Sequence, residues 1–283
     1  MENGQALVLG GGGIAGIAWI TGLLTGLAEA GQDVTGADLI VGTSAGSTVA
    51  AQVGSGLALD QLFRRQTEPA LQSREIVAKL DLEQAAADWA EMMEGVTSAE
   101  DALRRVGAYA LATDTVTEAE RRAVIVSRLP SQEWPSRRIQ IVAVDAETGQ
   151  TRVFDRDSGV SLVDAVAASC AVPGVWPPAT VDGRRYVDGG VRSIDNADLA
   201  AGYQRIVVIS PTGFDSPMPS PLPLRAVVGQ LREDGSDVTV ISPDEASTAA
   251  IGDNALDPAT RVPAAEAGRA QGRGGLAGLA EDG

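Results

Sequence analysis

Short apolar runs alternate with longer apolar segments over the first 54 residues. Ala6–Leu9 is an uninterrupted apolar run followed by glycine, which predicts a fully buried strand. Residues 16–30 are mostly apolar and stop at Gly31, as expected for a buried helix with glycine at its C-terminal cap. A second apolar run, Leu39–Val41, leads into a small-residue helix toward Gly54. Strand, helix and strand in this order predict a parallel sheet with right-handed crossovers.

Helical spacing dominates the middle of the chain, and strand patterns return after it. Residues 58–128 predict consecutive helices, with Ser98 and Thr117 placed as N-caps. Ile139–Val144 predicts a strand with a hairpin partner at Thr151–Phe154. Later segments predict two more helices and three more strands: Ser161–Ser169 and Leu224–Glu233, then Arg185–Val187, Ile206–Ile209 and Val238–Ile241. Beyond Pro263 the composition indicates a frayed helix or a flexible tail.

Composition and charge narrow the class of protein. Apolar residues make up 44% of the 283 residues, which excludes wholesale disorder, and ten aromatic residues imply an aliphatic core. The net charge of −16 argues against nucleic-acid binding and allows at most transient contact with an anionic membrane. The uncharged stretch from Asn3 to Ala28 is interrupted by Gly10–Gly13, and the N-terminus lacks the basic flank of a signal peptide. With Cys170 as the single cysteine, we expect a cytoplasmic protein.

The absence of histidine restricts the chemistry most strongly. A chain without imidazole has no histidine-based triad, no histidine proton shuttle and no histidine-ligated metal. Proton transfer near neutral pH must then use a carboxylate, the one lysine, a tyrosine or water. We expect neither a metal nor a cofactor.

Gly42-Thr43-Ser44-Ala45-Gly46 matches G-x-S-x-G between a predicted strand and a predicted helix. A sharp turn at this junction would expose the Ser44 hydroxyl as a nucleophile, and Gly42 and Gly46 would avoid clashes there. The same five letters also occur in ordinary turns, but the strand and helix on either side favour catalysis.

The glycines at residues 10–16 allow several interpretations. Gly11-x-Gly13-x-x-Gly16 fits a dinucleotide-binding fingerprint, but the second predicted strand lacks the acidic residue at its end that would hold the ribose. Alternatively, the backbone amides of Gly11, Gly12 and Gly13 would form an oxyanion hole beside the serine. Plain packing of glycines remains the structural alternative.

Asp188 is the candidate base, because it ends a short predicted strand and precedes two glycines. An ordinary aspartate, with a pKa near ~3.9, is a weak base for an alcohol. It can act only in direct contact with the serine, partly desolvated, while other groups stabilise the developing anion. Alone, Asp-Gly-Gly is an ordinary turn.

Three motifs in order resemble the patatin-like phospholipase family: Gly11-Gly-Gly-Ile-Ala-Gly16, Gly42-Thr-Ser-Ala-Gly46 and Asp188-Gly-Gly190, with Ala168-Ser-Cys-Ala-Val-Pro173 before the last. The resemblance covers about residues 5–210 and implies a three-layer α/β/α sandwich with a mostly parallel central sheet. It implies a Ser-Asp dyad in which Ser44 is the nucleophile and Asp188 the general base, with the oxyanion hole around Gly11–Gly13. It also implies one acyl hydrolase domain over 1–262, with 58–128 as a helical insertion and candidate lid, and 263–283 as a tail.

The sequence therefore predicts a serine acyl hydrolase that cleaves lipid-like carboxylic esters, such as lysophospholipids or monoacylglycerols, through an acyl-enzyme. Ala15 stands where the family often has Arg or Lys, which with the net charge argues against a phospholipid headgroup. An acyltransferase would use the same residues with a different acceptor. A non-catalytic scaffold and a dinucleotide-binding oxidoreductase are the alternatives. The sequence makes no prediction of oligomeric state.

Overall fold

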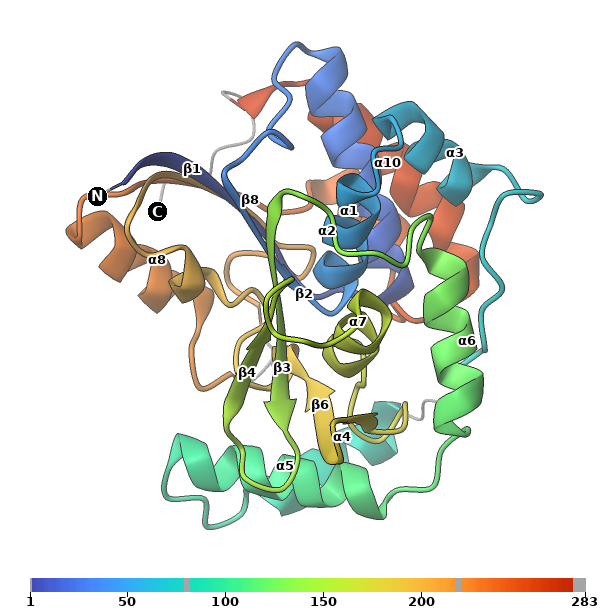
Figure 1. Cartoon of the computed structure of the whole chain (residues 1–283), viewed down its shortest axis with the longest axis vertical. Coiled ribbons are helices and arrows are strands. Elements are labelled where there is room, and N and C mark those ends of the chain that lie inside the picture. The colour runs from blue at the N-terminus through green and yellow to red at the C-terminus, as the bar shows by residue number, and fades with distance from the viewer. Residues whose placement is uncertain (1, 79–81, 217–219, 277–283) are drawn as a thin grey trace.

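The structure is a computed structural model that describes residues 2–78, 82–216 and 220–276. Its strands form one central sheet, and helices alternate with them along much of the chain (Figure 1). The strands are β1 (Glu2–Leu9), β2 (Leu39–Thr43), β3 (Arg138–Asp145), β4 (Thr151–Phe154), β5 (Ala179–Val181), β6 (Arg184–Asp188), β7 (Tyr203–Ile209) and β8 (Asp237–Ile241). The α-helices are α1 (Gly13–Glu29), α2 (Ala45–Gly54), α3 (Leu59–Thr67), α4 (Leu82–Met93), α5 (Ala99–Ala112), α6 (Glu118–Arg128), α7 (Leu162–Ser169), α8 (Leu224–Glu233), α9 (Glu245–Ile251) and α10 (Arg261–Gly272). Three short 3-10 helices are η1 (Gly189–Val191), η2 (Ala197–Ala200) and η3 (Pro258–Thr260).

The sheet is mostly parallel, as the sequence predicts. Its order is β5-β6-β3-β2-β1-β7-β8, and β4 pairs with β3 outside this path. The pairs β3-β2, β2-β1, β1-β7 and β7-β8 are parallel, whereas β4 and β6 run antiparallel to β3. The α/β fold class is therefore confirmed.

Helices cover both faces of this sheet. Leu7 and Leu9 of β1 belong to the larger core cluster, which includes side chains from α1, α2, α7 and α10. Ala6 and Val8 point to the opposite face and pack in a second cluster with α8 and η2. Because successive strand residues point to opposite faces, one apolar strand contributes to both cores. The result is the three-layer α/β/α sandwich (Figure 1).

Helix α10 packs tightly against α1. Most of α10 lies beyond residue 262, in the segment for which the sequence predicts a frayed helix or a flexible tail. A Cβ on Gly22 of α1 would overlap the Ala265 carbonyl oxygen, and one on Gly268 would overlap the Trp19 carbonyl oxygen. The Trp19 indole Nε1–H also donates to Gln271 Oε1 at 3.1 Å. Glycines on both helices thus allow close backbone approach. Residues 277–283 lie outside the described part of the chain.

One described strand and one described α-helix have no counterpart in the sequence prediction, and neither do the three short 3-10 helices. Strand β5 has three residues and follows two prolines, so its apolar pattern is too short to recognise. Helix α9 is small and polar, and begins where Asp244 Oδ1 accepts the Ser247 amide at 2.7 Å. The predicted N-caps Ser98 and Thr117 are both confirmed by hydrogen bonds from the amides three residues later.

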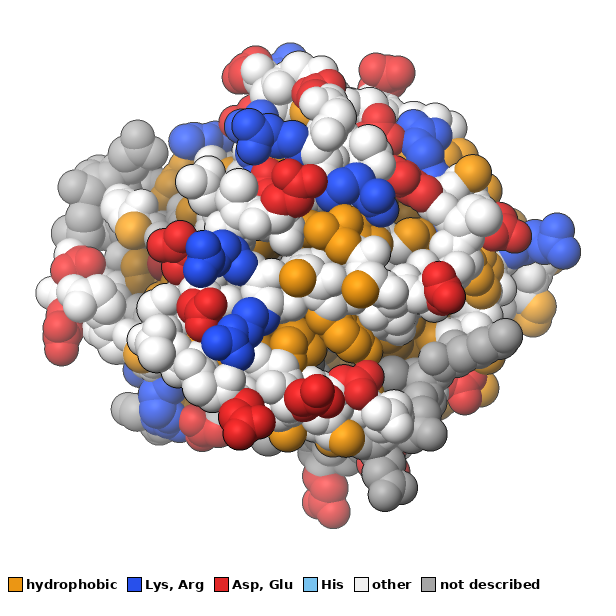
Figure 2. Space-filling view, turned by 90° about the horizontal axis from the view of Figure 1, so that it is seen from below, with side chains coloured by type: hydrophobic (Ala, Val, Ile, Leu, Met, Phe, Trp, Pro, Cys, Tyr) orange, Lys and Arg blue, Asp and Glu red, His pale blue; other side chains and the backbone are white. Residues whose placement is uncertain are grey.

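Helices α4 and α5 lie at the lower end of the molecule in Figure 1. In the view from below, hydrophobic side chains gather in the middle of the surface, with acidic and basic side chains around them (Figure 2). An open groove between the two helices is lined by Asp88, Glu91, Met92, Arg105, Ala108 and Tyr109. None of the helices in the described part of the chain is long and apolar enough to span a bilayer.

Because α1 and α10 are in such close contact, adding one methyl group between them should destabilise the fold. We expect Gly22→Ala to lower the free energy of unfolding by about 1–3 kcal/mol, because the new Cβ forces the two helices apart. Gly229→Ala in α8 is the matched control, since a Cβ there meets no atom within 4 Å. It should leave stability unchanged or raise it by up to about 1 kcal/mol. Urea unfolding followed by circular dichroism measures both, and equal stabilities for the two variants would contradict this packing.

Candidate active site

Ser44 occupies the sharp junction between β2 and α2. Its backbone φ and ψ are 52° and −115°, a sparsely populated conformation for a residue other than glycine. A Cβ on Gly46 would overlap the Leu9 carbonyl oxygen, and one on Gly42 would lie 2.7 Å from the Ser47 Cα. Both elbow glycines are therefore required by close backbone approach. The strained turn presents a buried serine at the end of the sheet.

Asp188 lies next to Ser44 because β2 and β6 share one edge of β3. Strand β4 pairs along the other edge of β3, where Val142 and Ala143 face Val153 and Arg152. On the shared edge Val142 pairs with Thr43 of β2, and the next residue, Ala143, pairs with Asp188 of β6. The two strands arrive from opposite directions and end against each other. Asp188 is thus the last residue of a strand that runs antiparallel to β3, within a sheet that is otherwise mostly parallel.

Asn196 connects the end of β2 with the end of β6 through hydrogen bonds. The sequence did not predict this residue as part of the site. This fully buried side chain donates from Nδ2 to Thr43 Oγ1 at 3.0 Å and to the carbonyl oxygens of Gly189 and Ser193 at 3.3 and 2.7 Å. It therefore connects the residue before Ser44 with the residue after Asp188. Its sequence context, Ile-Asp-Asn-Ala, carries no recognisable signal, because the partners become neighbours only through the fold.

The end of α7 holds the serine backbone from the other side. Ser169 Oγ accepts the Ser44 amide at 3.0 Å, and the Cys170 thiol donates to the Ser44 carbonyl at 3.2 Å. Burial raises the pKa of the Cys170 thiol, so it stays protonated and able to donate. Cys170 is buried, as expected, but it also forms part of the support for the elbow.

Burial raises the pKa of Asp188 from 3.8 to about 6. The Ser44 hydroxyl, the Gly190 amide and the Arg121 guanidinium act in the opposite direction by favouring the carboxylate. Oδ1 accepts the Gly190 amide at 2.7 Å, whereas Oδ2 is buried and accepts no hydrogen bond of standard geometry from any described residue. Of the groups that favour the ionised form, the Ser44 hydroxyl has the largest effect on the pKa of Asp188. Such a carboxylate is a stronger base than an exposed aspartate, yet is ionised at neutral pH.

One glycine of the expected oxyanion hole needs correction. The Gly11 amide donates to the Ile194 carbonyl at 2.9 Å, so it is already used, although Gly11 lies against the Ser44 side chain. The amides of Gly12 and Gly13 have no hydrogen-bond partner among the described residues. The same holds for the amide of Ala45, which follows the serine at the start of α2 and which the sequence analysis did not include. A free amide at this position is typical of the serine elbow.

Ser44 faces a small, partly open cavity. Its volume is about 20 Å³, close to that of one water molecule. The lining comes from distant parts of the chain and includes Gly13, Ile17, Arg121, Arg128, Trp176 and Leu256. Within the expected insertion 58–128, helix α6 supplies the two arginines. An ester chain needs more room than this, so at least one covering side chain must move when substrate enters.

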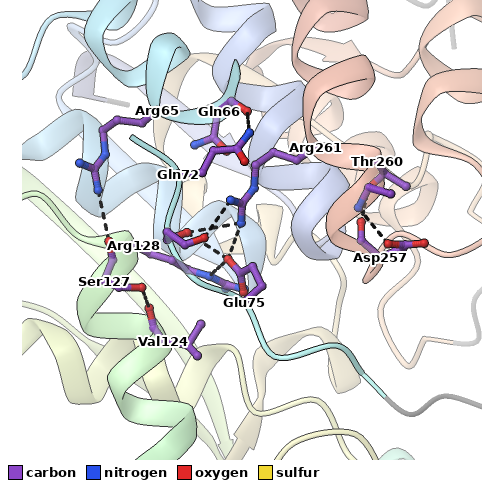
Figure 3. Close-up of polar contacts among 12 residues, drawn as sticks. Arg65, Gln66, Gln72, Glu75, Val124, Ser127, Arg128, Asp257, Thr260 and Arg261 are labelled. Atoms are coloured by element: carbon purple, nitrogen blue, oxygen red, sulfur yellow. Dashed lines mark hydrogen bonds and ion pairs between the residues drawn. The ribbon is translucent and has the colours of Figure 1, made fainter. Parts of the chain in front are cut away.

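A buried ion-pair network lies beside this cavity (Figure 3). Glu75 accepts two hydrogen bonds from Arg128, at 3.0 and 2.6 Å, and also pairs with Arg261 at the start of α10. The side chains of all three are at most 6% exposed. Burial alone would raise the pKa of Glu75, but the two guanidinium groups outweigh it and the pKa is lowered. Among residues 2–78, 82–216 and 220–276, no cluster of three or more Cys, Asp or Glu could hold a metal ion.

Comparison with known proteins places this architecture in a family. The family model described as patatin-like phospholipase matches residues 7–201. The chain belongs to the patatin-like phospholipase family. Two uncharacterized NTE family proteins, from Mycobacterium tuberculosis and Mycobacterium bovis, are 33% identical over 186 residues, which is 66% of this chain. The chain spans 42% of the length of these curated relatives.

Two solved structures are also similar. VipD from Legionella pneumophila matches with a TM-score of 0.46 and 14% identity, covering 96% of this chain and 66% of that one. The type III effector protein ExoU matches with a TM-score of 0.41 and 14% identity, covering 96% of this chain and 52% of that one.

The raised pKa of Asp188 predicts that this carboxylate destabilises the fold above pH 6. Between 3.8 and about 6 the folded protein binds more protons than the unfolded chain, so stability falls as pH rises through this window and stays lower above it. The difference corresponds to about 3 kcal/mol. We expect Asp188→Asn to raise the melting temperature at pH 8 and to have little effect below about pH 4.

Thermal unfolding at both pH values measures this effect. Asp157→Asn, in an exposed loop, is the control and should change the melting temperature at neither pH. A fall in melting temperature for Asp188→Asn at pH 8 would show that the ionised carboxylate stabilises the fold.

Proposed function

We propose that this chain is a serine acyl hydrolase that cleaves lipid-like carboxylic esters with Ser44 as nucleophile and Asp188 as general base. The observation that carries the proposal is the pairing of Thr43 and Asp188 with consecutive residues of β3, which brings a strained serine against a buried carboxyl. Membership of the patatin-like phospholipase family supports lipid hydrolysis as the reaction class. Small lipid esters such as lysophospholipids and monoacylglycerols are the proposed substrates.

Asp188 accepts and then donates a proton in each half of this mechanism. Its carboxylate accepts the Ser44 proton as Ser44 Oγ attacks the ester carbonyl carbon, and the C–O π electrons move to the carbonyl oxygen. When the tetrahedral intermediate collapses, the protonated Asp188 donates to the leaving alcohol. Asp188 then accepts a proton from a water molecule as its oxygen attacks the acyl carbon. When the second tetrahedral intermediate collapses, Asp188 returns this proton to Ser44 Oγ, the bond from Ser44 Oγ to the acyl carbon breaks and the carboxylic acid is released. A pKa of about 6 suits both roles near neutral pH.

Backbone amides hold the oxyanion in both steps. We assign this role to Gly12 and Gly13, with Ala45 as a further donor, since these amides have no other partner among the described residues. Gly13 and Ala45 line the cavity at Ser44. Removing one such donor in other serine hydrolases lowers kcat by about a hundredfold to a thousandfold.

The glycine loop favours acyl transfer over dinucleotide binding. A Cβ on Gly12 would lie 2.6 Å from Pro211 Cβ, and one on Gly13 would lie 2.6 Å from the Ala255 carbonyl oxygen. Protein therefore packs against one side of the loop, and one amide in the first turn of the helix is already used. The Ala255 carbonyl also accepts the Ala15 amide at 3.0 Å.

Hydrolysis of p-nitrophenyl esters of increasing chain length tests the proposal. We expect Ser44→Ala to lower kcat/KM by about a thousandfold or more, because the attacking oxygen is lost. Ser136→Ala, at an exposed serine, should retain the wild-type rate. A fluorophosphonate probe should label Ser44 in the wild type, as located by mass spectrometry. Folded protein that resists the probe and hydrolyses no ester would instead support a non-catalytic scaffold, and calorimetry with NAD(P) tests the oxidoreductase alternative.

A further inference from the structure

Arg121 is a buried cation without a partner. Its side chain comes from α6, the residue is 6% exposed, and Nε and Nη1 are buried with no hydrogen bond. The guanidinium lies 4.0 Å from the centroid of the Trp176 ring, and it forms no ion pair with any described residue. Leaving a charge buried and unpaired is costly, so proteins seldom retain one without use.

This cation lies in the wall of the cavity at Ser44. Arg121, Trp176 and Ser44 line the same cavity. The guanidinium is also near enough to Asp188 to lower the pKa of that carboxyl. Any group that binds Arg121 from the cavity would therefore lie beside the reacting ester.

The other arginines near the cavity already have a partner. Arg128 lines the cavity, but it shares Glu75 with Arg261, and both oxygens of Glu75 are occupied (Figure 3). Burial, together with the neighbouring Arg128, lowers the pKa of Arg121 to about 10, which still leaves it charged at neutral pH. The net charge of −16 belongs to the whole chain. At this interior position Arg121 lies near the carboxylates of Glu75 and Asp188 but forms an ion pair with no described residue.

We propose that Arg121 is a specificity-determining residue that binds an oxyanion, a phosphate or carboxylate, carried by the ester substrate close to its scissile bond. This inference rests on the proposed acyl hydrolase function. A guanidinium offers parallel N–H donors that match both oxyanions, and its charge-assisted hydrogen bonds are strongest where water is excluded. The Trp176 ring, whose centroid lies 4.0 Å from the guanidinium carbon, stabilises the cation at this position. A neutral ester would leave these donors unpaired, so substrates with an anionic group are preferred.

Binding without catalysis tests the site directly. Calorimetry on the full chain with Ser44→Ala uses decyl phosphate, decanoate and neutral decanol as probes, none of which contains an ester. We expect decyl phosphate or decanoate to bind at least about tenfold more tightly than decanol, and the stronger of the two identifies the oxyanion. Adding Arg121→Gln should abolish this preference, whereas Arg121→Lys should keep part of it. Arg122→Gln, at the exposed neighbour paired with Asp164, is the matched control and should keep all of it.

Kinetics at pH 8, above the Asp188 pKa of about 6, gives the second readout. Arg121→Gln should raise KM for decanoylglycerol phosphate by about tenfold or more relative to its effect on KM for monodecanoylglycerol. If wild type hydrolyses neither ester but binds decyl phosphate through Arg121, the proposed function fails and the oxyanion site stands.

Three results would overturn the site. One is equal binding of anionic and neutral probes by the folded Ser44→Ala chain, a comparison that remains valid even if Arg121→Gln does not fold. Another is a preference for the anion that persists in a folded Arg121→Gln variant. The third is hydrolysis of both esters with equal KM, in which case the acyl hydrolase function stands without the oxyanion site.

Discussion

The edge of β3 is the constraint on which the proposed site depends. Two strands from opposite directions divide that edge, and consecutive residues of β3 pair with Thr43 and Asp188. Backbone hydrogen bonds therefore fix the separation of serine and aspartate, and side-chain contacts refine it. Gly189 belongs to the same arrangement, because a Cβ there would overlap the Val142 carbonyl oxygen. Asp-Gly-Gly is thus more than a turn. Gly189 allows the close approach of β3, and Gly190 donates its amide to the Asp188 carboxylate.

The absence of histidine explains why the site is so deeply buried. A carboxylate becomes a useful base only when desolvation weakens its preference for the ionised form, and Asp188 is 4% exposed. Burial has a cost, because the same desolvation destabilises the folded protein at neutral pH. Neighbouring groups reduce that cost: the Gly190 amide, the Ser44 hydroxyl and the Arg121 guanidinium all favour the carboxylate. The positive charge of Arg121 thus belongs to the electrostatics of the site as well as to the proposed oxyanion binding.

Local patterns in the sequence were sufficient for most of the fold. Apolar runs that end at glycine identify β1 and β2, and the G-x-S-x-G context identifies the elbow, because strand, turn and helix are contiguous there. Contacts between distant segments were not predictable in the same way. The contact of Asn196 with Thr43 and the ion pairs of Glu75 have no local signature, since the residues they join lie 153, 53 and 186 positions apart. Arg121 has no ion pair with a described residue, so no pattern marks it either. Gly11 shows a related limit, because its amide is used by Ile194, a residue that no pattern places beside it.

The central claim is that a desolvated aspartate, without imidazole, deprotonates Ser44. The dependence of kcat/KM on pH for a p-nitrophenyl ester tests it most directly, because kcat/KM reports the ionisation of the free enzyme. We predict that kcat/KM rises with pH, with a midpoint near the Asp188 pKa of about 6, and reaches a plateau above it. A rate that is independent of pH between about 5 and 7 in folded protein would contradict it, since the proposed base loses its charge across that range.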